Sequence, residues 1–284
     1  MLIGLLPAGR PLEAGSPAAA LQLAAWQAAY PERVEEVAVR DGDWAIRVAG
    51  TWFYWAHGRL LPEKARGEWE RFAPQLIETY SPGPYRLPVV ASAEEADLRR
   101  LHERSMHEIP PRHNGFLGLL YGALSNGQAR PQMIRTSLLG FSVRVHPMIA
   151  APLARVDREL RRQLGDDDAM RAFVASLRRV DSQNWRWVAG TRSTSRHAYG
   201  IALDLIPRSY GGRFSYWRWA AQAGITEWWR LRADQRWHPP PEMIAVFEDE
   251  GFIWGGRWLL FDSIHFEYRP EVYELEASLK RRNG

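Results

Sequence analysis

The chain has 284 residues, of which 46% are hydrophobic and 25% are charged, and its formal net charge at pH 7 is +4. This composition is typical of a folded chain and argues against disorder or low complexity. Because the sequence contains no cysteine, disulfides, iron–sulfur clusters, zinc–thiolate sites and a thiol nucleophile are all excluded. Any bound metal ion must therefore be held by nitrogen and oxygen atoms.

Arginine carries almost all of the positive charge, because only two of the 37 basic residues are lysines, Lys64 and Lys280. Acidic residues are spread through the same stretches, and the sequence has no block of about five like charges. Such a dispersed pattern favours a solvated surface over a patch that binds nucleic acid. We therefore expect no nucleic-acid partner.

No apolar run reaches the roughly 18 residues that a transmembrane helix needs, so no transmembrane segment is expected. The apolar start, Met1 to Ala8, is very short, and its first basic residue, Arg10, follows it. A secretory signal has its basic residues before the apolar stretch. The sequence thus predicts either a cytoplasmic protein or an export signal that lies outside this chain.

The first part of the chain predicts a helix followed by a small antiparallel sheet. Ser16-Pro17 has the form of a helix N-cap with proline at the first position, which predicts a helix to about Tyr30. Short apolar stretches then alternate with glycine-containing connections, as in a β-meander. The predicted strands are 37–40, 44–48, 52–56 and 59–61, and the proline-rich residues 62–90 are predicted to be irregular.

A second helix is predicted from a capping box, Ser92-Ala93-Glu94-Glu95, to about Glu108, where Pro110 and Pro111 stop it. Residues 112–137 are interrupted by glycines and give no assignment. We place a domain boundary near residue 135, which divides the chain into an N-terminal domain of unknown role, 1–135, and a second domain, 136–284.

The second domain combines strand and helix patterns. The predicted strands are 138–145, 185–189, 201–205 and 264–268, and the predicted helices are 147–164, 168–180, 216–223, 241–250 and 270–281. The predicted fold class is α+β, with a small antiparallel sheet and flanking helices in the second domain, preceded by the helix and β-meander.

The strongest chemical signal lies in residues 195–204, Ser-Arg-His-Ala-Tyr-Gly-Ile-Ala-Leu-Asp. His197 is placed on a loop, and Asp204 lies in the strand that follows. Alternation in that strand puts Asp204 and the small Ala202 on the face opposite the larger apolar residues, which leaves room for a ligand. This spacing alone also occurs in surface histidines and strand carboxylates that bind no metal.

A second cluster about sixty residues later comprises Trp-Gly-Gly-Arg-Trp at 254–258 and Asp-Ser-Ile-His-Phe-Glu at 262–267. Here His265 lies on the polar side of its strand. Two histidines and one aspartate, with a fourth position open to water, are what a catalytic zinc ion needs, whereas a structural zinc has a fourth protein ligand. Zinc lowers the pKa of its bound water.

Asp262 could take the proton of that water. Strict alternation would point Asp262 away from His265, so this role requires the chain to turn before the strand begins. The alternative for Asp262 is a turn residue or a strand cap.

Together, Ser-x-His-x-x-Gly-x-Ala-x-Asp, Trp-Gly-Gly-x-Trp and Asp-x-x-His-Phe resemble the motifs of a zinc peptidase family. The family includes D-alanyl-D-alanine carboxypeptidases and L-alanyl-D-glutamate endopeptidases of peptidoglycan. The resemblance covers about residues 138–270. It implies a zinc peptidase domain with Zn²⁺ on His197, Asp204 and His265, and with Asp262 as general base. Many carboxypeptidase members have Glu in place of Asp262, so the sequence is more similar to the endopeptidase branch.

Some members of the family have a substrate- or oxyanion-binding arginine well upstream of Ser-x-His, whereas Arg192 lies only five residues before His197. Arg192 is the first candidate for this role and Arg186 the second, because a guanidinium suits a carboxylate or a developing oxyanion. The alternative is a solvated loop residue. Ser195 either binds substrate or caps the ligand loop, and Trp254 is a candidate for substrate binding.

The sequence therefore predicts zinc-dependent hydrolysis of a peptide bond in peptidoglycan stem peptides, by an endopeptidase or a D,D-carboxypeptidase. The alternative is a catalytically inactive, zinc-containing module that binds cell-wall peptides. The substrate implies a periplasmic or extracellular site of action. The sequence does not predict an oligomeric state.

Overall fold

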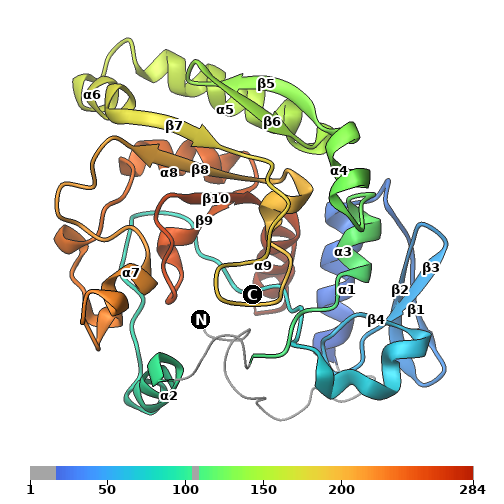
Figure 1. The fold of residues 1–284 in the computed structure, drawn as a ribbon. Coiled ribbons are helices and arrows are strands. Elements are labelled where there is room, and N and C mark those ends of the chain that lie inside the picture. Colours follow the sequence, from blue (N-terminus) through green and yellow to red (C-terminus); the bar gives the residue numbers. More distant parts are fainter. Residues whose placement is uncertain (1–16, 104–108, 284) are drawn as a thin grey trace.

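The computed structural model describes residues 17–103 and 109–283, and Figure 1 shows their arrangement. Within these residues, helices surround three antiparallel sheets, as the predicted α+β class requires. None of the described helices is both long enough and apolar enough to cross a membrane.

The predicted N-terminal helix and meander are confirmed. The helix is α1 (Pro17–Ala29), and the sheet has the order β1 (Val34–Arg40), β2 (Asp43–Val48), β3 (Thr51–Tyr54) and β4 (Leu61–Pro62). Each of the first two connections is a two-residue turn with positive φ at both positions, 48° and 76° at Asp41-Gly42 and 48° and 72° at Ala49-Gly50. Such turns match the twist of a β-hairpin, and glycine makes them accessible.

The 3₁₀ helix η1 (Glu63–Arg71) follows the meander, and residues 72–91 have no regular structure. Helix α2 (Ser92–Glu103) begins where the capping box predicts it, and the rest of the predicted helix, 104–108, lies outside the described residues. Two short helices, α3 (Gly115–Leu120) and α4 (Asn126–Gln132), lie in the stretch 112–137, for which no element is predicted.

The predicted strand 138–145 is correct for residues 141–145 and wrong before them, because the chain turns at 139–140 in a hairpin. Its strands are β5 (Ile134–Leu138) and β6 (Phe141–Val145), joined by Leu139 and Gly140 with φ of 53° and 88°. Apolar residues continue on both sides of this turn, so the pattern alone predicts one strand. The predicted helix 147–164 is confirmed as the 3₁₀ turn η3 (Pro147–Ile149) and helix α5 (Ala150–Gln163).

The predicted helix 168–180 is correct only in its first half. Helix α6 (Asp168–Ser176) is followed directly by β7 (Leu177–Asp181). Leu177 and Val180 are both buried at a helix-like spacing of three, because a bulge interrupts the strand between Leu177 and Arg179. The predicted strand 185–189 is also wrong, since only one isolated bridge, from Trp187 to Thr194, forms there.

The sheet of the second half has the order β7-β8-β10-β9. Its remaining strands are β8 (Ala202–Pro207), β9 (Phe252–Trp254) and β10 (His265–Tyr268), of which β9 was not predicted. The three helices predicted in this part of the chain are confirmed as α7 (Trp217–Gln222), α8 (Pro241–Asp249) and α9 (Pro270–Asn283). Short 3₁₀ turns complete the chain: η4 (Arg196–Tyr199), η5 (Trp228–Arg230), η6 (Ala233–Gln235) and η7 (Gly255–Arg257).

The main hydrophobic core runs through both halves of the chain, from Ala19 in α1 to Leu275 in α9. These two helices, the first and the last, pack against each other (Figure 1). A buried hydrogen bond of 2.9 Å from Tyr30 to Glu271 connects the same two parts of the chain. The boundary near residue 135 stays a prediction.

Candidate metal centre

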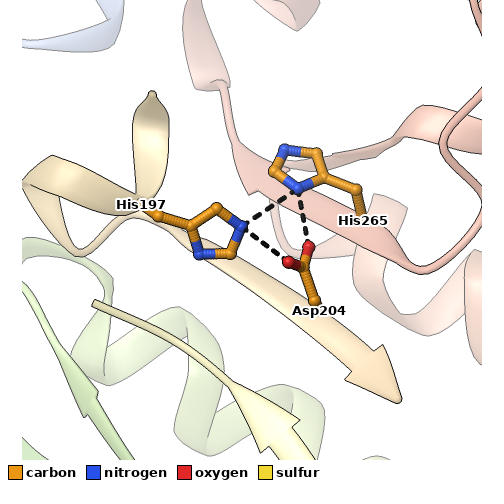
Figure 2. Close-up of side chains that lie close together, drawn as sticks. All are labelled: His197, Asp204 and His265. Atoms are coloured by element: carbon orange, nitrogen blue, oxygen red, sulfur yellow. Dashed lines mark hydrogen bonds and ion pairs between the residues drawn. The ribbon is translucent and has the colours of Figure 1, made fainter. Parts of the chain in front are cut away.

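Three predicted ligands meet at the two central strands of the β7-β8-β10-β9 sheet. Strands β8 and β10 are antiparallel neighbours, and their register pairs His265 directly with Asp204. Directly paired residues lie on the same face of a sheet, so both side chains are on one side. His197 comes from η4, immediately before β8, and Figure 2 shows its ring turned toward the other two side chains.

The three side chains form a buried cluster of the size of a metal site. His197 Nε2 is 3.1 Å from Asp204 Oδ2 and 3.3 Å from His265 Nδ1, and His265 Nδ1 is 2.8 Å from Asp204 Oδ1. The candidate ligand atoms all lie within 4.8 Å of one another. Ligands about 2.1 Å from a tetrahedral zinc ion are roughly 3.4 Å apart, so two imidazole nitrogens and one carboxylate oxygen here fit such an ion.

Hydrogen bonds outside the cluster orient both imidazole rings. His197 Nδ1 donates to the carbonyl of Ser182 at 2.8 Å, which leaves Nε2 with its lone pair toward the cluster. His265 Nε2 donates to the Glu267 carboxylate at 3.2 Å, so Nδ1 faces Asp204. The sequence analysis did not single out Glu267, although alternation along the strand places it on the face of His265.

Glu267 is itself held by a buried series of charged groups. Arg269 donates to Glu267 at 2.8 Å and also pairs with Glu271, which accepts the hydrogen bond from Tyr30. All four side chains are buried. The orientation of His265 therefore depends on contacts that reach Tyr30, directly after α1.

The electrostatics of the cluster favour positive charge next to the carboxylates of Asp204 and Glu267. Burial lowers the pKa of His265, but hydrogen bonds with Asp204 and Glu267 outweigh it and raise the pKa to about 10. Burial raises the pKa of Asp204, but His197 and His265 outweigh this and hold it well below its usual range. Both shifts show that the cluster attracts positive charge, which a metal ion held by these three residues would supply.

Asp262 lies on the turn that its predicted role requires. The His265 N–H donates to the Asp262 carbonyl at 3.2 Å, so a tight turn precedes β10 and frees Asp262 from strand alternation. Burial raises the pKa of the Asp262 carboxyl to about 7. Within the described residues, its Oδ1 is buried and has no hydrogen-bond partner. This carboxyl therefore has a free acceptor atom and titrates near neutrality.

Trp254 supports this turn from the core. Its indole N–H donates to the carbonyl of Ser263 at 2.8 Å, and its side chain is completely buried. Trp254 is a predicted substrate-binding residue, but burial leaves its ring no exposed atom with which to contact a substrate. The residue instead fixes the loop that carries Asp262.

The structure separates the two candidate arginines. Arg186 Nη2 is 3.8 Å from Asp204 Oδ2, and 40% of its side chain is exposed beside the cluster. Arg192 is exposed, and no contact within the described part of the chain joins it to the cluster. Ser195 is buried and accepts the His197 N–H at 3.3 Å, which makes it the cap of η4.

Gly200 brings the ligand loop close to the β5-β6 hairpin. Its φ is +69°, and a Cβ there would lie 2.4 Å from Met133 Sδ and 2.9 Å from the backbone nitrogen of His146. Only glycine allows this approach, because both the backbone conformation and the space exclude a side chain. The motif glycine thus holds His197 and Asp204 at the correct separation.

Two regions of the chain match known families. Residues 22–77 match a domain of unknown function. Residues 189–268 match the family described as D-alanyl-D-alanine carboxypeptidase, and this stretch contains the three clustered ligands and Asp262. No curated protein and no solved structure matches the chain. The match over residues 189–268, together with the buried His-Asp-His cluster, supports a zinc peptidase family for this region.

Proposed function

We propose that the protein is a zinc peptidase that hydrolyses a peptide bond in peptidoglycan stem peptides. The observation that carries this proposal is the buried convergence of His197, Asp204 and His265 inside a region that matches a D-alanyl-D-alanine carboxypeptidase family. These residues would hold the ion through two imidazole nitrogens and one carboxylate. Zinc bound there would supply Lewis acidity and a water molecule with a lowered pKa.

The remaining chemistry is assigned to residues of the chain. Asp262 is proposed as the general base, because its carboxyl lies on the turn directly before the His265 strand and its Oδ1 has no partner within the described residues. Arg186, with its exposed guanidinium beside Asp204, is proposed to bind a substrate carboxylate or the developing oxyanion. Arg192 lacks such a position and is the weaker candidate.

The branch of the family is proposed from the identity of the base. Aspartate at position 262, together with Trp-Gly-Gly-Arg-Trp at 254–258, favours an endopeptidase over a D,D-carboxypeptidase. Since peptidoglycan lies outside the cytoplasm, this function implies a periplasmic or extracellular site of action.

Digestion of purified sacculi tests the proposal, with metal analysis of the same samples. We expect about one zinc ion per chain and release of peptide fragments whose masses identify the bond cut. His197→Ala should lose both the bound zinc ion and the release of fragments. Asp262→Asn should keep the metal and stop cleavage. Full cleavage by His197→Ala would contradict the proposal, and zinc and peptide binding without cleavage by the wild type would favour the inactive binding module.

A further inference from the structure

A cavity of about 390 Å³ lies between the proline-rich segment 78–88 and the β9 edge of the central sheet. The segment forms one wall, and residues of β9, η7 and α9 form the other. This segment lies entirely outside both stretches that match family models, since the first ends at residue 77 and the second begins at residue 189. The cavity thus joins a part of the chain without an assigned role to the sheet that carries the metal ligands.

Two contacts place the cavity next to the candidate metal centre. Trp258, which lines it, packs its ring against His265 with 5.5 Å between ring centroids. Ile253, which also lines it, pairs directly with Glu267 between β9 and β10, so it lies on the same sheet face as Glu267 and His265. The cavity is therefore one side chain away from a metal ligand.

The proline-rich wall is held firmly in place. Tyr80 accepts the backbone N–H of Trp254 at 2.9 Å and pairs with the buried Glu248. Arg257 donates to Glu248 at 2.6 Å and also to the backbone carbonyls of Gly83 and Pro84. Because prolines in the segment fix φ as well, little conformational freedom remains to be lost when a ligand binds.

The charges around the cavity favour an anionic ligand. Arg86 is exposed and lines the cavity, and no acidic group in the described part of the chain pairs with it. Among the other charged residues of the lining, Arg257 pairs with Glu248, and Glu78 is the only carboxylate that the described residues contribute to the wall. A free guanidinium beside apolar atoms of Trp258 and Ile253 suits a carboxylate carried on an aliphatic group.

We propose that this cavity is a substrate subsite in which Arg86 binds a free carboxylate of an acidic peptide. The aliphatic part of that peptide residue packs against Trp258 and Ile253. The inference rests on the proposed peptidase function and adds a specificity determinant from outside the region that matches the peptidase family.

The test compares two forms of one stem peptide, with either a free carboxylate or a carboxamide at the acidic residue. Wild-type protein should show a KM about tenfold lower for the acidic form, because a hydrogen bond to a charged group contributes about 1.5 kcal/mol or more. Arg86→Gln should raise the KM for the acidic form to that of the amide and leave kcat unchanged. Arg158→Gln, an exposed arginine on α5, is the matched control and should behave as the wild type.

Peptide affinity measured calorimetrically in zinc-loaded Asp262→Asn protein, with and without Arg86→Gln, separates this inference from the proposed function. Loss of the preference for the acidic form in Arg86→Gln supports the subsite, even if the wild type cleaves no peptide. If cleavage requires His197 but the preference for the acidic form survives in Arg86→Gln, the subsite is overturned. The peptidase function then stays intact. A wild type that prefers the amide also overturns it.

Discussion

The two four-stranded sheets of this protein differ in how many acidic and histidine residues they bury, one (Asp43) in the meander and three in the other sheet. In the meander β1-β2-β3-β4, the ion pair of Glu35 with Arg47 lies on the surface, with side chains 43% and 41% exposed. In the β7-β8-β10-β9 sheet, Asp204, His265 and Glu267 are buried on the two central strands. Surface pairs contribute about 0–1 kcal/mol, whereas buried charges are costly unless they are paired or bind a metal ion. This contrast separates the meander from the sheet that carries the candidate metal ligands.

The sheets also differ in how they are connected. Successive strands of the meander are neighbours, and its first two turns contain only two residues each. In the central sheet Asp204 and His265 are 61 residues apart in the sequence and become partners only when β8 pairs with β10. The candidate metal centre therefore forms only in the folded chain, so we expect it to be sensitive to distant substitutions.

The largest difference between the sheets is expected for removal of one carboxylate from each. Asp204→Asn removes a charged ligand from the centre of the cluster, and we expect loss of zinc and at least about a thousandfold loss of peptide hydrolysis. Glu35→Gln in the meander should change the free energy of unfolding by no more than about 0.5 kcal/mol and leave activity unchanged. Metal analysis, kinetic assays and urea titration measure the two effects, and similar losses in both variants would abolish the distinction.

A second comparison uses one glycine from the meander, Gly50, and one from the ligand loop, Gly200. Gly50 in the meander has a φ of +72° with nothing within 4 Å of an added Cβ, so Gly50→Ala should cost about 1 kcal/mol from backbone strain alone. Gly200 has a similar φ, but its added Cβ would meet Met133 and the backbone of His146. We expect Gly200→Ala to cost more than about 3 kcal/mol and to weaken metal binding. Equal destabilisation of the two variants, measured by denaturant unfolding, would contradict this reading.

His146 lies between the two four-stranded sheets in the sequence. Its buried position predicts that the stability of the protein depends on pH. Its Nε2–H donates to the Tyr121 carbonyl and its Nδ1 accepts the Met148 N–H, so the buried ring is neutral. Burial lowers its pKa to about 4. Since the unfolded chain binds this proton near pH 6.5, stability is complete above pH 6.5 and falls by about 3 kcal/mol as the pH drops to 4.

His146→Asn provides the control for that pH dependence, because asparagine does not titrate and its oxygen can still cap the Met148 N–H. The stability of this variant, measured by urea titration, should fall less than that of the wild type between pH 6.5 and 4. Parallel pH profiles of the two proteins would show that His146 is not the group responsible.

A smaller effect is expected from the carboxylate behind His265. Glu267→Gln keeps a hydrogen-bond acceptor for Nε2 but removes its charge, and zinc affinity should fall about 10- to 100-fold. Competition with a chelator measures this change. An unaltered affinity would mean that Glu267 serves only the buried pairing with Arg269.

The sequence was most informative where local rules decide the structure. Glycine turns indicated the meander, and alternation placed Asp204 and His265 on polar strand faces before any contact was known. It was misleading where tertiary pairing decides. The bulge in β7 gave Leu177 and Val180 a helix-like spacing, and the three residues of β9 are too few to show a period.

Similar limits apply to the candidate site. The ligand motifs were recognisable, but the choice of Arg186 over Arg192 depends on which side chain reaches the cluster, and no sequence pattern records that distance. The wall formed by residues 78–88 had no periodic signal, because it is held by Tyr80 and Arg257 rather than by secondary structure. Such contacts between distant segments become visible only in the folded chain.

X-ray absorption at the zinc edge tests the central claim most directly. Zinc-loaded wild-type protein should show only nitrogen and oxygen ligands at about 2.0–2.2 Å, with the scattering signature of two imidazoles. His265→Ala should lose one imidazole signature and most of its affinity for zinc. If that variant bound one zinc ion per chain with an unchanged spectrum, the ion would lie elsewhere, and the assignment of His197, Asp204 and His265 as its ligands would be contradicted.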